Sequence, residues 1–400
     1  MAPRLLLVIV LASACQTYDF QPEVPSAYSQ KTDARKIVGR QFKPNLMFLI
    51  DKSGSMNFPA NDSVAPCTPG CGQSCPAGCK TRLIELKSAM ETFLSTSGSV
   101  AWMGMAVFPS ATTATDGCGA TGPADILVPL APNQADDEGA LNATAGAVNY
   151  QIQNLNVGGG TPTGDSLKFL GNYAPLADPD PKAPREDFVV LLTDGLPNCN
   201  SNNPNTCSSA SCRCTLQPAT ACMAASLCTQ GCLDRDNSAA QVTALRAKNI
   251  RTIVVGFGAD TANGDGPDTL NAMAENGGFA RSCPKGTDAE CGSNNTCDAT
   301  SRLCARKFYQ ATSAAELAST LADIAKTIIP PEFCTLVLDE VPKDAGLLTV
   351  TVDGKHESTG PNTWSYAAGK VTFNGALCDR LKQSTPANPV DVQFRIGNAL

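Results

Sequence analysis

Residues 46–55 read Leu-Met-Phe-Leu-Ile-Asp-Lys-Ser-Gly-Ser. The unbroken apolar run at the start of this stretch predicts a central strand that is buried on both faces, because the side chains of a strand alternate between the two faces of its sheet. The run leads directly into Asp51, and Ser53 and Ser55 lie on the turn that leaves the strand. The stretch therefore predicts a buried strand whose carboxyl end presents one carboxylate and two hydroxyls.

Two later apolar runs repeat this strand pattern. Phe188–Leu192 leads through Thr193 into Asp194, and Thr252–Gly256 is a third buried run. A further strand is expected over residues 100–108 and a weaker one over residues 125–130. Helices are expected over residues 82–94, 139–155, 164–173, 237–248 and 313–328. Alternating strands and helices are typical of a parallel sheet with helices packed on both faces. We therefore expect an α/β fold with a doubly wound, mostly parallel sheet.

The acids at the ends of these strands predict a cation site. In an open parallel sheet, ligands bind at the carboxyl ends of the strands where the winding reverses, so Asp51 and Asp194 can converge there. Residues 158–164, Gly-Gly-Gly-Thr-Pro-Thr-Gly, add a loop whose glycines let the backbone approach closely and whose threonines can supply a further oxygen. Carboxylates and hydroxyls suit a hard divalent cation, Mg²⁺ or alternatively Mn²⁺.

The combined motif resembles the metal-ion-dependent adhesion site of von Willebrand factor A (VWA) domains. The matching residues, in the family's order, are Asp51, Ser53, Ser55, Thr161 and Asp194. The resemblance covers residues 44–329 and implies that the two serines and the first threonine of the loop, rather than Thr163, coordinate the cation directly or nearly so. It also implies that the two aspartates contact the cation largely through water, and that a carboxylate of the ligand fills the open coordination position of the cation. A VWA scaffold with an unused site is the alternative.

The amino-terminal segment predicts secretion and a lipid anchor. Residues 1–14 combine a basic residue with a short apolar stretch, as secretory signals do. Residues 11–15, Leu-Ala-Ser-Ala-Cys, resemble a bacterial lipobox, which implies that Cys15 is lipidated and becomes the first mature residue. Gln16 implies the outer membrane, by resemblance to the sorting of Gram-negative lipoproteins. Residues 15–43 are expected to form the lipidated tether. Plain signal cleavage and a disulfide role for Cys15 are the alternatives.

A narrower resemblance concerns the two ends of the mature chain. The opening Cys15-Gln-Thr-Tyr-Asp-Phe20, the cysteine content and the carboxyl-terminal β pattern resemble the adventurous gliding motility lipoproteins of gliding bacteria. That family implies a VWA lipoprotein that serves as a surface adhesin in gliding motility.

Cysteine usage agrees with secretion. The chain holds 19 cysteines, and an even number remains when Cys15 is set aside as the lipid site. In an oxidising compartment these predict structural disulfides, whose pairing stays open. Most of them fall in residues 66–80, 199–232 and 283–304, which read as long inserted loops stapled by disulfides. A zinc site is disfavoured because the single histidine, His356, is far along the chain from these clusters.

Residues 332–400 change to a period of two and predict a small β module. Hairpins are expected around Asp353–Gly354 and Ala368–Gly369, and a last strand at Val392–Ile396. The two cysteines of this module are candidates to pair with each other.

One enzymatic reading competes with the cation site. Two segments match the sequence motifs of GDSL esterases, in which Ser166 would be the nucleophile: Gly164-Asp-Ser-Leu167 and Asp353-Gly-Lys-His356. That family places its serine just after the first strand, whereas Ser166 follows a glycine-rich loop and opens a helix. The chain also has a single histidine, the residue that most often serves as general acid or base in catalysis. We therefore expect that the chain is not an enzyme.

Two functions without catalysis remain. The first is an outer-membrane, lipid-anchored and surface-exposed adhesin, whose Mg²⁺ binds a carboxylate on an extracellular surface or protein. The second is a structural envelope scaffold that docks to outer-membrane complex proteins, with the metal incidental. The net charge of −7 argues against nucleic acid as a partner.

Overall fold

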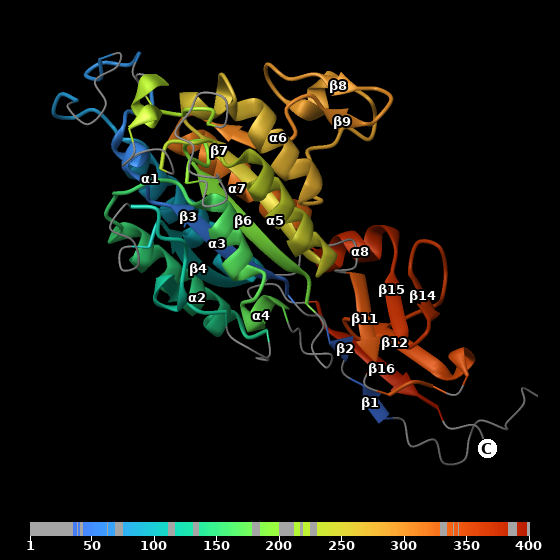
Figure 1. Cartoon of the computed structure of the whole chain (residues 1–400). Helices are drawn as coiled ribbons and strands as arrows, with labels where there is room; N and C mark the ends of the chain where they lie inside the picture. Colours follow the sequence, from blue (N-terminus) through green and yellow to red (C-terminus); the bar gives the residue numbers. More distant parts are fainter. Residues whose placement is uncertain are drawn as a thin grey trace, which may run out of the picture. The chain divides into compact units, whose positions relative to one another are not determined.

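The computed structural model describes residues 35–37, 39–40, 43–61, 63–68, 75–110, 117–130, 136–177, 185–199, 212–216, 219–224, 230–328, 334–338, 340–342, 344–382 and 390–397. The chain divides into two compact units (Figure 1). The larger, which we call the α/β unit, lies within residues 41–334. The smaller, which we call the β unit, combines the segment before residue 41 with residues from 335 onward.

A six-stranded sheet forms the centre of the α/β unit, in the order β10-β7-β6-β3-β4-β5. The strands are β3 (Asn45–Asp51), β4 (Trp102–Phe108), β5 (Ile126–Val128), β6 (Asp187–Thr193), β7 (Ile250–Phe257) and β10 (Tyr309–Ala311). All neighbouring strands are parallel except β4 and the edge strand β5, which are antiparallel. The expected mostly parallel sheet is confirmed.

Helices cover both faces of this sheet (Figure 1). One face carries α1 (Arg82–Ser97), α2 (Glu138–Gln153) and α7 (Ala314–Ile328), and the other carries α3 (Thr163–Leu170), α5 (Arg235–Ala247) and α6 (Gly266–Asn276). Leu46, Phe48 and Ile50 pack into the first layer, and Met47 and Leu49 pack into the second. Each such side chain stabilises the fold by about 1.5–3 kcal/mol when fully buried. The apolar run therefore holds two cores together, as a doubly wound sheet requires. A single turn, α4 (Ala174–Ala177), follows α3.

The winding of the sheet reverses beside β3. From β3 the chain moves to β4 and β5 on one side, and it then crosses to β6, β7 and β10 on the other. Because β3 and β6 are adjacent and parallel, the residues that follow them emerge at the same edge of the sheet. Asp51 is the last residue of β3, and Asp194 directly follows β6. Both acids therefore lie at the place where open parallel sheets bind ligands.

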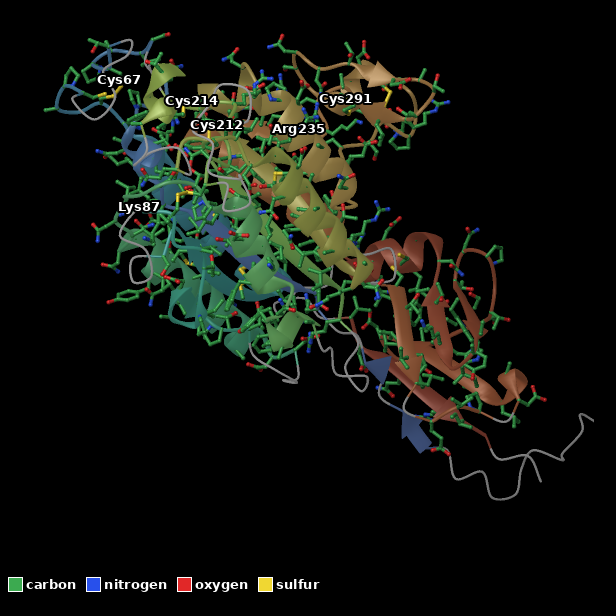
Figure 2. The ribbon with its side chains drawn as sticks, viewed as in Figure 1. Cys67, Lys87, Cys212, Cys214, Arg235 and Cys291 are labelled. Atoms are coloured by element: carbon green, nitrogen blue, oxygen red, sulfur yellow. A yellow bond between two sulfur atoms is a disulfide. The ribbon has the colours of Figure 1, made fainter. Side chains whose placement is uncertain are left out.

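Disulfides staple the cysteine-rich loops of the α/β unit. The described pairs are Cys67–Cys79, Cys118–Cys199, Cys212–Cys232, Cys214–Cys222, Cys283–Cys297 and Cys291–Cys304. Cys75, Cys334 and Cys378 are disulfide-bonded as well. Figure 2 shows the disulfides in yellow and labels Cys67, Cys212, Cys214 and Cys291. The prediction of structural disulfides is confirmed for these cysteines.

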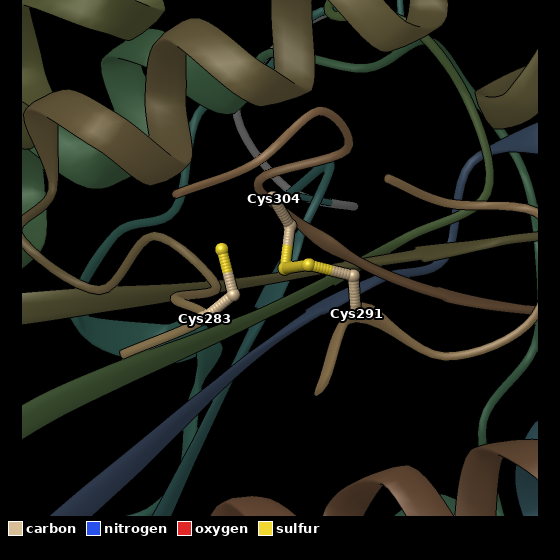
Figure 3. Close-up of side chains that lie close together, drawn as sticks. All are labelled: Cys283, Cys291 and Cys304. Carbon is tan, nitrogen blue, oxygen red and sulfur yellow. A yellow bond between two sulfur atoms is a disulfide. The ribbon is translucent and has the colours of Figure 1, made fainter. Parts of the chain in front are cut away.

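The last of these loops brings several sulfurs close together. The Sγ atoms of Cys283, Cys291 and Cys304 lie within 4.8 Å of one another. Figure 3 shows that Cys291 and Cys304 are joined to each other, and Cys283 pairs with Cys297. A thiolate is needed to ligate a metal, so these disulfides leave the trio without a ligand atom for zinc. The short strands β8 (Cys297–Asp298) and β9 (Leu303–Cys304) pair in the same loop.

The β unit consists of two four-stranded sheets, in the orders β1-β16-β12-β13 and β14-β15-β11-β2. The strands are β1 (Arg35–Ile37), β2 (Gly39–Arg40), β11 (Thr335–Leu338), β12 (Leu348–Val352), β13 (Lys355–Glu357), β14 (Trp364–Ala367), β15 (Lys370–Phe373) and β16 (Val392–Ile396). Both expected hairpins are present, and their turns at Asp353–Gly354 and Ala368–Gly369 have positive φ angles. A helix, α8 (Gly375–Lys382), follows β15 and was not expected.

One expected boundary needs correction. Residues 15–43 were expected to be a tether, but β1 pairs with β16 and β2 pairs with β11. The two short segments complete the edges of sheets built by the carboxyl-terminal residues, where their backbone groups find hydrogen-bond partners. Residues 35–40 therefore contribute strands to the β unit.

The expected signal peptide and the lipidation site Cys15 lie outside the described residues. Among the described residues, no helix has the length and apolar character needed to cross a membrane.

Candidate metal centre

Asp51 is fixed at the end of β3 by its own turn and by the neighbouring strand. Its side chain is fully buried. The Ser53 backbone N–H donates to Oδ1 at 2.8 Å. This contact forms an Asx turn, in which an aspartate side chain accepts a hydrogen bond from the backbone two residues later. The Thr193 hydroxyl, at the end of β6, donates to Oδ2 at 2.7 Å. The carboxylate is therefore held from β3 and from β6 at once.

Asp194 accepts hydrogen bonds from other parts of the chain. The Ser55 hydroxyl donates to Oδ1 at 3.0 Å, so the turn after β3 contacts the acid after β6. The guanidinium of Arg82, the first residue of α1, donates from Nη1 to Oδ2 at 2.9 Å. Asp194 is fully buried, and Arg82 is almost so. The structure thus brings the two predicted acids and both predicted serines into one cluster.

The oxygens of this cluster are joined by hydrogen bonds whose lengths are compatible with neighbouring ligands of a small hard cation. Ser53 Oγ lies 3.0 Å from Ser55 Oγ, which lies 3.0 Å from Asp194 Oδ1. Neighbouring ligands of an octahedral Mg²⁺, with metal–oxygen distances of about 2.1 Å, are about 3.0 Å apart. Two hydroxyls and a carboxylate also form the all-oxygen set that Mg²⁺ and Mn²⁺ prefer. The residues present therefore fit such a cation.

The glycine loop is joined to the turn after β3 by backbone hydrogen bonds. The Gly158 N–H donates to the Lys52 carbonyl at 2.9 Å, and the Gly54 N–H donates to the Gly159 carbonyl at 2.9 Å. Gly159 has a φ of +85°, and a Cβ there would lie 2.7 Å from the Gly117 carbonyl oxygen. Only glycine allows this approach without strain. The loop is therefore fixed against the turn that carries the serines.

Thr161 follows in that loop and is buried. Asn198, in the segment after β6, accepts a hydrogen bond from the Thr161 N–H at 2.8 Å and donates one to its carbonyl at 3.2 Å. The Cys118–Cys199 disulfide packs behind the loop, since a Cβ on Gly160 would lie 2.7 Å from the Cys199 sulfur. The backbone of Thr161 is thus held by the loops that follow β4 and β6.

Thr163 takes a different position, as the first residue of α3. Its hydroxyl is buried and has no hydrogen-bond partner among the described residues.

Burial and the nearby charge of Asp194 disfavour the ionised form of Asp51. The pKa of Asp51 is raised to about 7, first by burial and then by the negative charge of Asp194, while hydrogen bonds from Ser53 and Thr193 oppose the rise. A buried carboxylate is unfavourable unless a positive charge or donors compensate it. A divalent cation would provide that compensation.

Reasoning from the sequence missed three residues that hold the acids or the glycine loop in place. Thr193 precedes Asp194 in the motif. Its position at the end of the strand next to β3 could have indicated that it contacts Asp51. Arg82 is 112 positions from Asp194, and Asn198 lies in a cysteine-rich loop. No local pattern connects either of them to the site.

The residues of the esterase motif are engaged elsewhere. Ser166 is fully buried in α3, and its Oγ accepts the Thr121 N–H at 3.1 Å. Asp353 lies on the turn between β12 and β13, where its Oδ1 accepts the Asp391 N–H at 2.8 Å, and His356 is exposed on β13. A buried hydroxyl of this kind is not available to attack a substrate.

No protein-family model matches the chain, and no curated protein does. Solved structures similar to it include the pilus adhesin SpaC from Lactobacillus rhamnosus GG, with 15% identity, a TM-score of 0.40, and coverage of 90% of this chain and 40% of that one. Manganese-loaded TRAP from Plasmodium vivax has 14% identity, a TM-score of 0.33, and coverage of 61% and 67%.

A third similar structure is proximal thread matrix protein 1 from the mussel byssus, with a zinc-occupied MIDAS motif. It has 12% identity, a TM-score of 0.36, and coverage of 73% of this chain and 48% of that one. The chain spans less than two thirds of the length of the pilus and byssus proteins that it matches.

Proposed function

We propose that this chain is a surface adhesin that binds an acidic ligand through a divalent cation, Mg²⁺ or Mn²⁺. The residues proposed to hold the cation are Asp51, Ser53, Ser55, Thr161 and Asp194. The observation that carries the proposal is the run of three oxygens, from Ser53 through Ser55 to Asp194, with successive separations of 3.0 Å at the edge of the sheet where the winding reverses.

Each residue would have a distinct part in binding. The two serine hydroxyls and the Thr161 hydroxyl are neutral ligands, and Asp51 orients the serine turn through the Ser53 N–H. Gly158 and Gly159 are exposed beside the cluster, so a ligand can approach there. When bound, the cation supplies an electrophilic position that attracts an external carboxylate, because most of its protein ligands are neutral.

The test is adhesion by cells that display the full chain, compared with cells that display Asp51→Ala. We expect the variant to lose adhesion while surface protease accessibility and the thermal melt show a folded, exported protein. Asp323→Ala is the matched control: it removes a carboxylate of the same unit from the exposed side of α7 and should adhere normally. EDTA should abolish wild-type adhesion, and adhesion that persists in both EDTA and the Asp51 variant rejects the proposal.

We also propose that Cys15 is lipidated and anchors the chain in the outer membrane, where it serves in gliding motility. Metabolic labelling with a fatty acid should mark the wild type and not Cys15→Ser. A label that survives in the variant would refute the anchor. A motile host whose gliding is unchanged by Asp51→Ala would refute the role in motility.

The alternative is a structural envelope scaffold, favoured by the disulfides that staple the long loops. This reading gains support if the chain captures the same envelope partners before and after Asp51→Ala.

A further inference from the structure

Arg82 occupies a position that is unfavourable for a cation. It is the first residue of α1, and only 4% of it is exposed. The free N–H groups at the start of a helix carry partial positive charge, which repels a cation. A buried arginine at this position is therefore costly unless an acid compensates it. Such a departure from local preference indicates a role beyond packing.

Groups from several segments hold the guanidinium in one place. Nη1 donates to Asp194 Oδ2 at 2.9 Å and to the Asp194 carbonyl at 3.3 Å, and Nε donates to the Pro59 carbonyl at 3.3 Å. The group lies 5.7 Å from the centroid of the Phe58 ring. Gly258, after β7, faces it so closely that a Cβ there would lie 2.9 Å from Nε. These contacts fix the charge against Asp194.

The arginine changes the charge that the acids offer to a metal. Asp51 and Asp194, when ionised, would present two negative charges to a divalent cation, and Arg82 reduces their sum to one. It also engages Oδ2 of Asp194, while Oδ1 faces Ser55. Two positive charges within several ångströms of each other in a buried site repel strongly, because little water screens them.

We propose that Arg82 is a resident counter-cation that weakens metal binding by the Asp51–Asp194 pair and so sets the affinity of the site. The proposal rests on the proposed function, since it concerns the same cation. Without metal, Arg82 compensates Asp194, so folding does not depend on metal. With metal, Arg82 leaves a net positive charge at the site, which favours an anionic ligand.

The experiment is a titration of the metal-free full chain with Mn²⁺ alone, with free Mn²⁺ followed by electron paramagnetic resonance. Arg82→Gln removes the charge and keeps an N–H donor for Asp194, and it should bind Mn²⁺ at least about tenfold more tightly than the wild type. Arg82→Lys keeps the charge and should bind within about threefold of the wild type. Arg185→Gln is the matched control, because the Arg185 side chain is 5% exposed and pairs with an acid, Asp136, beside the amino ends of the strands.

A second readout is the thermal melt with and without Mn²⁺. Metal-free Arg82→Gln should melt below the wild type and should gain more from saturating Mn²⁺, whereas a merely structural arginine would lower both melts equally. If Arg82→Gln does not fold, Arg82→Met is titrated with the same expectation.

The outcomes separate this proposal from the proposed function. If the wild type binds Mn²⁺ and a folded, uncharged variant binds it equally or more weakly, the role of Arg82 is rejected and the metal site stands. If only the uncharged variant binds, Arg82 is confirmed as the opposing charge and the metal-dependent function of the wild type is rejected. If neither binds, both are rejected.

Discussion

Acids are buried at both ends of the central sheet, but the groups that contact them differ. At the amino ends of the strands, Asp136 accepts hydrogen bonds from the Arg185 guanidinium at 2.6 Å, the Trp102 indole at 2.7 Å and the Lys43 N–H at 2.6 Å. Asp187 accepts the Asn45 amide at 2.8 Å. Donors from several segments thus converge on these acids.

At the carboxyl ends, Asp51 and Asp194 share two serines, one threonine and Arg82, and the exposed glycine loop borders them. A buried acid is therefore not by itself a sign of a binding site. Around Asp136 the donors are a guanidinium and two N–H groups. Around Asp51 and Asp194, three hydroxyls beside an exposed loop accompany the Ser53 N–H and Arg82, and we propose that these oxygens receive a cation.

The largest expected effect comes from the disulfide behind the glycine loop. Replacing both Cys118 and Cys199 with Ser should lower the free energy of unfolding by about 4 kcal/mol, because the bond closes a loop with a sequence separation of 81. Mn²⁺ affinity should also fall, since the disulfide packs against Gly160. Denaturant unfolding and Mn²⁺ titration measure the two effects, and unchanged affinity would show that the loop is held without the disulfide.

Breaking the ion pair at the amino ends should cost stability and leave metal binding alone. Arg185→Gln removes the charge that compensates Asp136 and should lower the free energy of unfolding by about 3 kcal/mol. Its Mn²⁺ affinity should equal that of the wild type. A matching loss of affinity would contradict the separation of the two ends.

The amino ends also predict a pH effect. Burial is the main cause that raises the pKa of Asp187 to about 6, while the Asn45 hydrogen bond and Arg185 oppose it. An acid whose pKa is raised on folding adds stability below its unfolded pKa near 4, and that stability is lost as pH rises through about 6. Denaturant unfolding at pH 4 and pH 7 should show a gain at low pH about 2 kcal/mol larger for the wild type than for Asp187→Asn. Equal pH dependence of the two proteins would show that Asp187 is not the group responsible.

The smallest effects come from two glycines. Gly160→Ala would place a Cβ 2.7 Å from the Cys199 sulfur and should cost about 1 kcal/mol in the free energy of unfolding, with weaker Mn²⁺ binding. Gly146→Ala, within α2, meets no atom within 4 Å and should stabilise the chain by about 0.5–1 kcal/mol. Thermal melts of the two variants should therefore shift in opposite directions, and a destabilised Gly146→Ala would contradict the open space found there.

The fold was predictable where the pattern is local. The apolar run before Asp51 is buried on both faces, and the turns of both carboxyl-terminal hairpins lie at the expected residues. The helix α6 was not predicted, because it opens with Gly266-Pro and only Leu270, Met273 and Ala274 of its later residues form a short apolar stripe. Strands β1 and β2 were missed because pairing with distant strands, rather than composition, defines them.

The candidate site divides in the same way. Asp51, Ser53 and Ser55 fall within one turn, and Asp194 follows a strand of the same kind, so sequence spacing could predict that they meet. Arg82 could not be predicted, because its contact depends on where α1 begins relative to the end of β6. A charged residue at the start of an amphipathic helix normally faces water.

Crystals of the full chain grown with Mn²⁺ and measured at the manganese absorption edge would show where the cation binds. We expect one dominant anomalous peak in contact with Ser53 Oγ and Ser55 Oγ and beside Asp194, and the loss of that peak in Asp51→Ala. Saturating Mn²⁺ that gives no peak at this cluster, or a dominant peak elsewhere on the chain, would contradict this expectation.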